Sequence, residues 1–163
     1  MTRLASIPMS RRAALSAALA AALFSTSALA AEPPVNTLKT GFFGGRTDTA
    51  INGYDTVAYF TVGKPVKGQD TLAHDWNGAK WKFSTQAHLD LFKANPEKYA
   101  PQYGGYCAYG VTRGYLVKVE PDQFTVRDGK LYLNYDAEVQ ATWSKDAAGY
   151  IRVADSKFAA LLK

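Results

Sequence analysis

Cysteine, methionine and histidine are scarce in this sequence, and their scarcity limits the chemistry available to it. The 163 residues include one cysteine, two methionines and two histidines, and both methionines lie within the first nine residues. A single cysteine, Cys107, cannot form a disulfide within the chain, so stability must come from the hydrophobic core. The rest of the chain, which has no methionine, also lacks the methionine clusters that suit Cu(I).

Common catalytic motifs are absent as well. The sequence contains no HExxH motif, no CxxC pair, no glycine-rich phosphate loop and no recognisable Ser/His/Asp hydrolase pattern. These absences count modestly against an enzyme.

The N-terminus has the three-part pattern of a secretory signal peptide. Residues 1–12 carry three arginines and no acid, residues 13–24 form an alanine-rich apolar run, and residues 28–30 are small or apolar as a cleavage site requires. The apolar run is shorter than the roughly 20 residues that a membrane span needs, and no later segment approaches that length. We therefore expect residues 1–30 to be a signal peptide cleaved near Ala30/Ala31, which directs the protein to the periplasm.

Two export routes are open. Residues 10–15 (SRRAAL) resemble the twin-arginine motif, although Ala14 and Ser16 stand where that motif prefers Phe and Lys. The weakly hydrophobic run also fits this route, and general secretion is the alternative.

The basic excess belongs largely to the signal peptide. The formal net charge is +5, but residues 1–30 carry three of the 19 basic residues and none of the 14 acidic ones, which leaves an excess of two. A chain so close to neutrality has no electrostatic footprint for nucleic acid.

A β-hairpin is predicted for residues 71–83. Asn77-Gly78 is a preferred pair for a type I′ turn, because both turn positions need positive φ. We expect His74 and Trp81 to face each other on the apolar side of this hairpin. The full register pairs Trp76 with Ala79, Asp75 with Lys80, His74 with Trp81, Ala73 with Lys82, and Leu72 with Phe83.

The flanking pattern predicts one α+β domain with β-hairpins packed against helices and with helices at the C-terminus. Residues 31–49 are expected to be a flexible leader that includes a glycine-rich loop at 41–45, and residues 50–163 the domain. Residues 51–60 fit a helical turn or a strand equally well.

Further elements follow the first hairpin. Ser84 or Thr85 is expected to cap a helix that runs to about Asn95 and buries Leu91 and Phe92, and a second helical turn follows at residues 96–99. The remaining pattern predicts strands at 115–119, 124–127 and 130–135, with Asp128-Gly129 as a hairpin turn, and then two helical segments within 137–163 that join at Gly149.

Three residues are candidates for metal or thiol chemistry. His74 is either a core histidine or a ligand, and Cys107 is either a small buried hydrophobe or a thiolate. His88, within the predicted helix, is expected to be a solvated or half-buried surface residue, peripheral to any site. Two histidines and a cysteine could form a copper set or an open zinc set, but their spacings match no compact motif.

The sequence resembles the YHS domain, a small module related to heavy-metal-associated TRASH domains. Residues 74–85 (HDWNGAKWKFST), Phe92 and residues 96–99 (PEKY) carry the resemblance. Residues 53–60 (GYDTVAYF) and 99–110 (YAPQYGGYCAYG) resemble an exported branch of the family. The resemblance covers about residues 50–110 well, and continues loosely through residues 131–143.

The resemblance implies a metal ion, copper or zinc, but the usual ligands are missing. Metal-binding relatives place cysteines where this chain has Ala58 and Ser84. Only His74 matches the histidine for which the family is named, and Cys107 belongs to the segment of the exported branch. The predicted metal ligands are therefore His74 and Cys107.

Three functions follow from this interpretation. The first is a periplasmic, non-enzymatic module that binds a soft metal such as copper through Cys107 and His74. The second is a thiol-dependent enzyme or redox accessory with Cys107 as nucleophile and a histidine as base. The third is a structural interaction module with no small ligand. The sequence does not indicate which protein partner, if any, it has.

Overall fold

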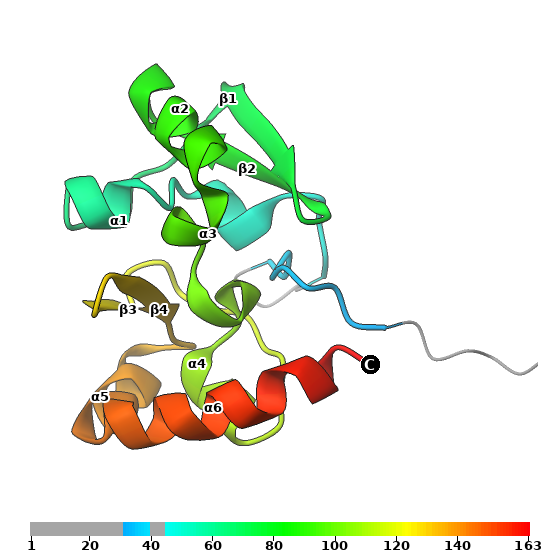
Figure 1. The fold of residues 1–163 in the computed structure, drawn as a ribbon, viewed down its shortest axis with the longest axis vertical. Helices are drawn as coiled ribbons and strands as arrows, with labels where there is room; N and C mark the ends of the chain where they lie inside the picture. Colours follow the sequence, from blue (N-terminus) through cyan, green and yellow to red (C-terminus); the bar gives the residue numbers. More distant parts are fainter. Residues whose placement is uncertain (1–30, 40–44) are drawn as a thin grey trace, which may run out of the picture.

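The computed structural model describes residues 31–39 and 45–163, and it has the predicted α+β architecture (Figure 1). The signal peptide and most of the predicted glycine-rich loop lie outside the described residues. The strands are β1 (Gln69–Trp76), β2 (Ala79–Phe83), β3 (Phe124–Arg127) and β4 (Lys130–Leu133). The helices are α1 (Ala58–Thr61), α2 (Gln86–Ala94), α3 (Pro96–Tyr99), α4 (Ala108–Thr112), α5 (Ala137–Lys145) and α6 (Ala147–Leu161), with short 3-10 turns η1 (Ala50–Gly53) and η2 (Gln102–Gly105).

The first hairpin forms at the predicted turn. Asn77 and Gly78 have φ of 50° and 79°, as a type I′ turn requires. The predicted register is confirmed next to the turn, and His74 lies opposite Trp81. The pairing of Leu72 with Phe83 is wrong, because the register shifts between Gln69 and Ala73 and Phe83 pairs with Gln69. A bulge of this kind breaks the strict alternation from which the register was extrapolated.

The helices that follow β2 are set by their caps. The Thr85 side chain accepts a hydrogen bond from the backbone N–H of His88, and α2 begins there as predicted. Its buried residues are Leu89 and Phe92, three positions apart on one face. The prediction of Leu91 as a core residue is wrong, because Leu91 lies on the opposite face and is 40% exposed. Pro96 then starts α3, which confirms the predicted second turn.

The second hairpin joins β3 to β4 through Asp128-Gly129, as predicted. The predicted strand at residues 115–119 is absent from this hairpin. Its backbone instead bonds to the segment around α4, since the N–H of Cys107 donates to the Val117 carbonyl and the N–H of Tyr115 to that of Gly110. Alternating hydrophobicity therefore marked a segment that is only partly buried and has no strand partner.

The C-terminal helices meet at Asp146 rather than at the predicted Gly149. The Asp146 side chain accepts from the N–H of Gly149 and so caps α6, while Asp136 caps α5 in the same way through Val139. A Cβ at Gly149 would overlap the Asp146 carboxylate. The cap of α6 therefore requires glycine at position 149, because a Cβ there would occupy the space of the Asp146 carboxylate.

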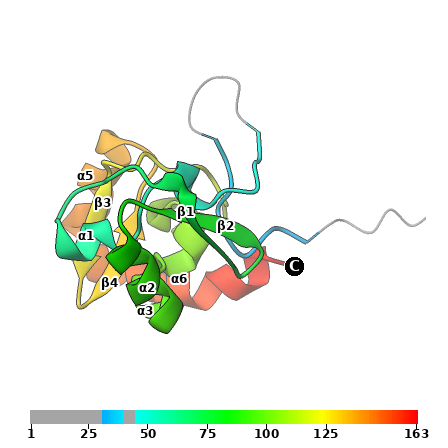
Figure 2. The same ribbon diagram turned by 90° about the horizontal axis from the view of Figure 1, so that it is seen from above.

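The core consists of two neighbouring hydrophobic clusters, and Tyr109 packs against both. The first lies under β1, β2 and α2 and includes Trp81, Phe83 and Phe92. The second lies between α4 and α6 and includes Tyr106 and Trp143. In Figure 1 the β3–β4 hairpin lies between the first hairpin and α6. In Figure 2 the first hairpin and α2 lie in front of α6.

Part of the segment expected to be a leader packs against the domain. Val35 and Asn36 are buried, and the N–H of Asn36 donates to the carbonyl of Gly104. The Asn36 side chain also donates to the Gly105 carbonyl. Among the described residues, no helix combines the length and the apolar character that crossing a membrane requires.

The packing of Trp81 predicts a large loss of stability on truncation. Trp81 is 1% exposed and its ring lies 5.1 Å from that of Phe92. We expect Trp81→Ala to lower the free energy of unfolding by about 3 to 5 kcal/mol, measured by urea denaturation. The control is Tyr115→Ala, an aromatic residue that is 65% exposed, with an expected change within about 0.5 kcal/mol. A loss below about 1 kcal/mol for Trp81→Ala would show that its burial is not what holds the hairpin to α2.

Candidate functional site

A buried carboxylate, Asp55, joins three elements of the first half of the fold. Asp55 is fully buried. Its Oδ1 accepts from the N–H groups of Val57 (3.0 Å) and Ala58 (3.3 Å) at the start of α1. Its Oδ2 accepts from the N–H (2.8 Å) and the hydroxyl (2.6 Å) of Ser84, just after β2. Asp55 thus caps α1 and fixes the chain between β2 and α2.

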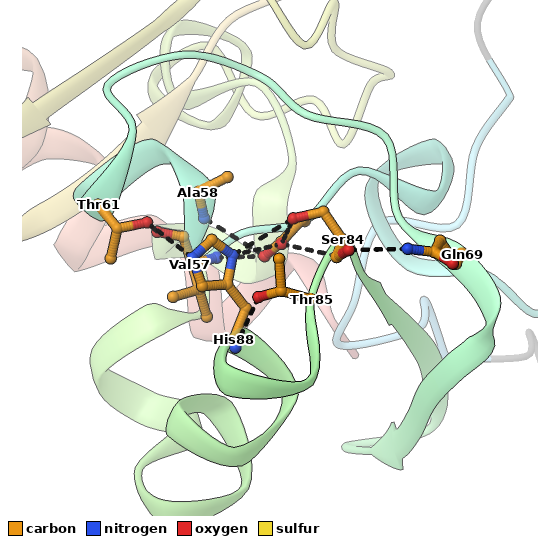
Figure 3. Close-up of polar contacts among 8 residues, drawn as sticks. Val57, Ala58, Thr61, Gln69, Ser84, Thr85 and His88 are labelled. Carbon is orange, nitrogen blue, oxygen red and sulfur yellow. Dashed lines mark hydrogen bonds and ion pairs between the residues drawn. The ribbon is translucent and has the colours of Figure 1, made fainter.

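His88 completes this polar cluster from α2 (Figure 3). Its Nδ1 lies 2.6 Å from Asp55 Oδ2, and its Nε2 lies 3.0 Å from the Thr61 hydroxyl at the end of α1. The His88 side chain is 13% exposed. His88 is half-buried, which is one of the two states expected of it. Its contacts were not expected, because its ring bridges α1 and α2 and meets the buried carboxylate of Asp55.

The hydrogen bonds of this cluster all stay within the domain. Asp55 receives hydrogen bonds from four groups besides His88, so every contact of this carboxylate is with a hydrogen-bonding group of the domain. The Thr61 hydroxyl lies 3.0 Å from His88 Nε2 and donates to the Val57 carbonyl at 3.1 Å, so the hydroxyl that meets the imidazole also bonds within α1.

The cluster has the order carboxylate, imidazole, hydroxyl that activates nucleophiles in some enzymes. Its contacts nevertheless all run inside the domain, from α1 to β2 and α2. Catalysis by such a series also needs donors aimed at the charge that develops on a substrate. The contacts of Asp55, Ser84 and His88 support a positioning role, in which the cluster holds α1 and α2 against the end of β2.

Sequence reasoning missed this cluster for an identifiable reason. Ser84 and His88 are four residues apart at a predicted helix start, a spacing that places them on one side, so their proximity could have been found. Asp55, however, is 33 residues before His88. No local pattern connects the two, and the fold alone brings them together.

Cys107 lies at the start of α4 in a buried position. It is 1% exposed, and its sulfur accepts from the N–H of Gly110 (3.3 Å) as the helix cap. The thiol donates to Asn134 Oδ1 at 3.6 Å, and the same oxygen accepts from the N–H of Tyr109. Burial raises the pKa of the Cys107 thiol, although the N–H groups around the sulfur oppose this shift. The protonated thiol is the form that this site favours.

His74 has different neighbours. It is half-buried on β1, and its ring lies 6.4 Å from that of Phe92. His74 therefore contacts the Phe92 ring of the first hydrophobic cluster, whereas Cys107 contacts amide groups near α4. Across the described residues, no three His, Cys, Asp or Glu side chains are grouped so that they could hold a metal ion. Metal ligation by the pair His74 and Cys107 stays a prediction.

The Asp55 cluster predicts a large difference between two aspartates. Asp55→Ala leaves the N–H and O–H donors of a buried site without their acceptor, so we expect a loss of about 3 to 5 kcal/mol in the free energy of unfolding. Asp90→Ala is the matched control, because Asp90 is exposed on α2 and bonds only to Gln86. Its expected change is within about 0.5 kcal/mol in the same urea titration. Equal losses for the two variants would contradict the role assigned to Asp55.

Comparison with known proteins supports the resemblance seen in the sequence. Residues 57–103 match the family model of the YHS domain. No curated protein and no solved structure matches the chain. The matched stretch runs from the start of α1 through the first hairpin, α2 and α3, and it includes Thr61, Ser84 and His88 of the Asp55 cluster. This chain therefore carries a YHS domain at residues 57–103.

Proposed function

We propose that this protein is an exported, non-enzymatic YHS-domain module of the periplasm, and that Cys107 serves its fold rather than a reaction. The observation that carries the proposal is the environment of the thiol. Its sulfur caps α4 through Gly110, its proton points to Asn134, and the residue is buried. A cysteine held in this way has the contacts of a structural residue.

Both alternative uses of Cys107 require the thiolate. The thiolate is the nucleophile in thiol enzymes and the ligand in metal sites, and its formation depends on the local pKa. Burial raises the pKa of Cys107. An enzyme would in addition need a base bonded to the sulfur, whereas the groups that hydrogen-bond to it are the Asn134 amide and backbone N–H groups. The negative charge of Asp136 also raises the pKa of the thiol, which opposes formation of the thiolate.

A metal-binding function is the second candidate, because the YHS domain is associated with heavy-metal binding. In this form of the proposal a soft ion such as copper, or zinc, is held by Cys107 and His74. The residues present do not fit such a site well. The sulfur faces N–H donors and an amide oxygen, whereas a soft metal prefers thiolate and imidazole ligands.

Thiol reactivity distinguishes these functions. We expect Cys107 in the native protein to react with DTNB at least about 100-fold more slowly than in urea, because the buried, protonated thiol is neither accessible nor nucleophilic. Asn134→Ala removes the acceptor of the thiol proton and opens space beside the sulfur, so it should speed the reaction. Native reactivity equal to that of the unfolded chain would overturn the structural role, and would favour the thiol-dependent enzyme.

Metal content tests the second candidate directly. Protein purified from a periplasmic fraction should contain no stoichiometric copper or zinc, and Cys107→Ser should leave its metal content unchanged. His88→Ala serves as the control, since His88 bonds to Asp55 and not to Cys107. Stoichiometric metal that is lost in both Cys107→Ser and His74→Ala, and kept in His88→Ala, would establish the metal site instead.

Export has its own test. The location in the periplasm rests on the signal pattern of residues 1–30. We expect replacement of Arg11 and Arg12 by lysine to keep the protein in the cytoplasm with its signal peptide uncleaved, as measured by fractionation and immunoblotting. Replacement of Arg3 alone is the control and should leave export unchanged. Export of the double variant at the normal rate would assign the protein to general secretion.

A further inference from the structure

A cleft rich in lysine lies on the side of the first hairpin. Its lining residue Gln69 donates to the Ser84 carbonyl, so the cleft adjoins the Asp55 cluster, whereas none of its lining residues contacts Cys107. Its volume is about 550 Å³, and it is bordered by η1, by the segment that leads into β1, and by β2. Three lysines are among its lining residues, Lys39, Lys67 and Lys82. The one carboxylate in its lining is Asp70, whose side chain is 87% exposed.

The backbone brings two of these lysines together. The N–H of Gly68 donates to the Gly53 carbonyl (2.9 Å), which holds the start of β1 against η1. A Cβ on Gly68 would lie 2.4 Å from the carbonyl carbon of Lys82, so only glycine permits this approach. A Cβ on Gly53 would lie 3.4 Å from Lys82 Cδ and 3.9 Å from Lys67 Cε. The side chains of Lys67 and Lys82 therefore both pass close to Gly53.

The positive charge of the cleft is only partly balanced. Lys82 pairs with Asp70 at 2.5 Å, whereas the Lys67 ammonium lies 4.4 Å above the Tyr54 ring and donates to the Asn52 carbonyl. Among the described residues no ion pair involves Lys39 or Lys67. Burial and the nearby charge of Lys82 both lower the pKa of Lys67. An anion between the two ammonium groups would relieve this repulsion.

We infer that this cleft binds a small, multiply charged anion that carries phosphate groups. Lysine ammonium groups act on phosphate as point charges. The cleft has room for a phosphorylated molecule larger than phosphate alone. The inference is independent of the role of Cys107. Lys67 and Lys82 are the residues assigned to hold the phosphate, and Asp70 competes with it for Lys82.

The experiment is a titration of the full chain, labelled with 15N, with inorganic pyrophosphate at constant ionic strength. We expect saturable shifts of the Gly53 and Gly68 amides. Lys67→Gln and Lys82→Gln, which keep most of the side-chain stem, should each weaken binding about tenfold or more, since each removes a charged hydrogen bond. The matched control is Lys64→Gln, an exposed lysine outside the cleft, and it should leave the dissociation constant unchanged.

Asp70→Asn provides a test that does not rely on loss of binding. It removes the carboxylate that pairs with Lys82, so it should tighten pyrophosphate binding severalfold. Three results would overturn the inference: no saturable shifts in the cleft, equal weakening by Lys64→Gln, or weaker binding in Asp70→Asn. Equal weakening by Lys64→Gln would mean that pyrophosphate is attracted by the surface charge as a whole.

Discussion

The buried carboxylate of Asp55 is the interaction on which the first half of the structure depends. It accepts hydrogen bonds from α1, from Ser84 after β2 and from His88 on α2, so one side chain fixes three elements that no sheet connects. Neither hairpin has more than two strands. Isolated two-stranded hairpins are marginal in water, and they need a helix or another layer for stability. Asp55 supplies a polar anchor for that layer, and Trp81 and Phe92 supply the apolar contact.

Positive-φ residues shape the rest of the fold. Ile51 and Asn52 in η1 and Tyr103 in η2 adopt left-handed conformations without being glycine. Each lies beside the buried segment around Asn36, which bonds to the backbone of Ile51 and of Gly104. A Cβ on Gly104 would lie 1.9 Å from the Pro34 carbonyl oxygen. The segment around Asn36 therefore lies between η1 and η2. Its packing against both turns holds their strained backbone in place.

Local chemistry made much of the fold predictable from the sequence. Asn77-Gly78, Asp128-Gly129, the Thr85 cap and Pro96 each act over two to four residues, and the structure confirms each one. The predictions that were wrong concern elements whose structure depends on contacts between residues far apart in the sequence. Residues 115–119 alternate like a strand but pair with the α4 segment, and the bulge in β1 shifts Phe83 to Gln69. The Asp55 cluster and the lysine cleft were missed for the same reason, because each joins residues from separate parts of the chain.

The position of Cys107 between the two hydrophobic clusters gives a physical reason for a small side chain there. Cys107 belongs to the first cluster, whereas its neighbours Tyr106 and Ala108 belong to the second. Tyr109 packs against both. Residues 106–109 thus lie between the two clusters, and the side chains of this short segment pack into both of them. A thiol packs as a small hydrophobe and still caps α4, a combination that neither alanine nor a larger apolar residue provides. The side-chain amide of Asn134 bonds to both the Cys107 thiol and the N–H of Tyr109, and it links residues 106–109 to the end of β4.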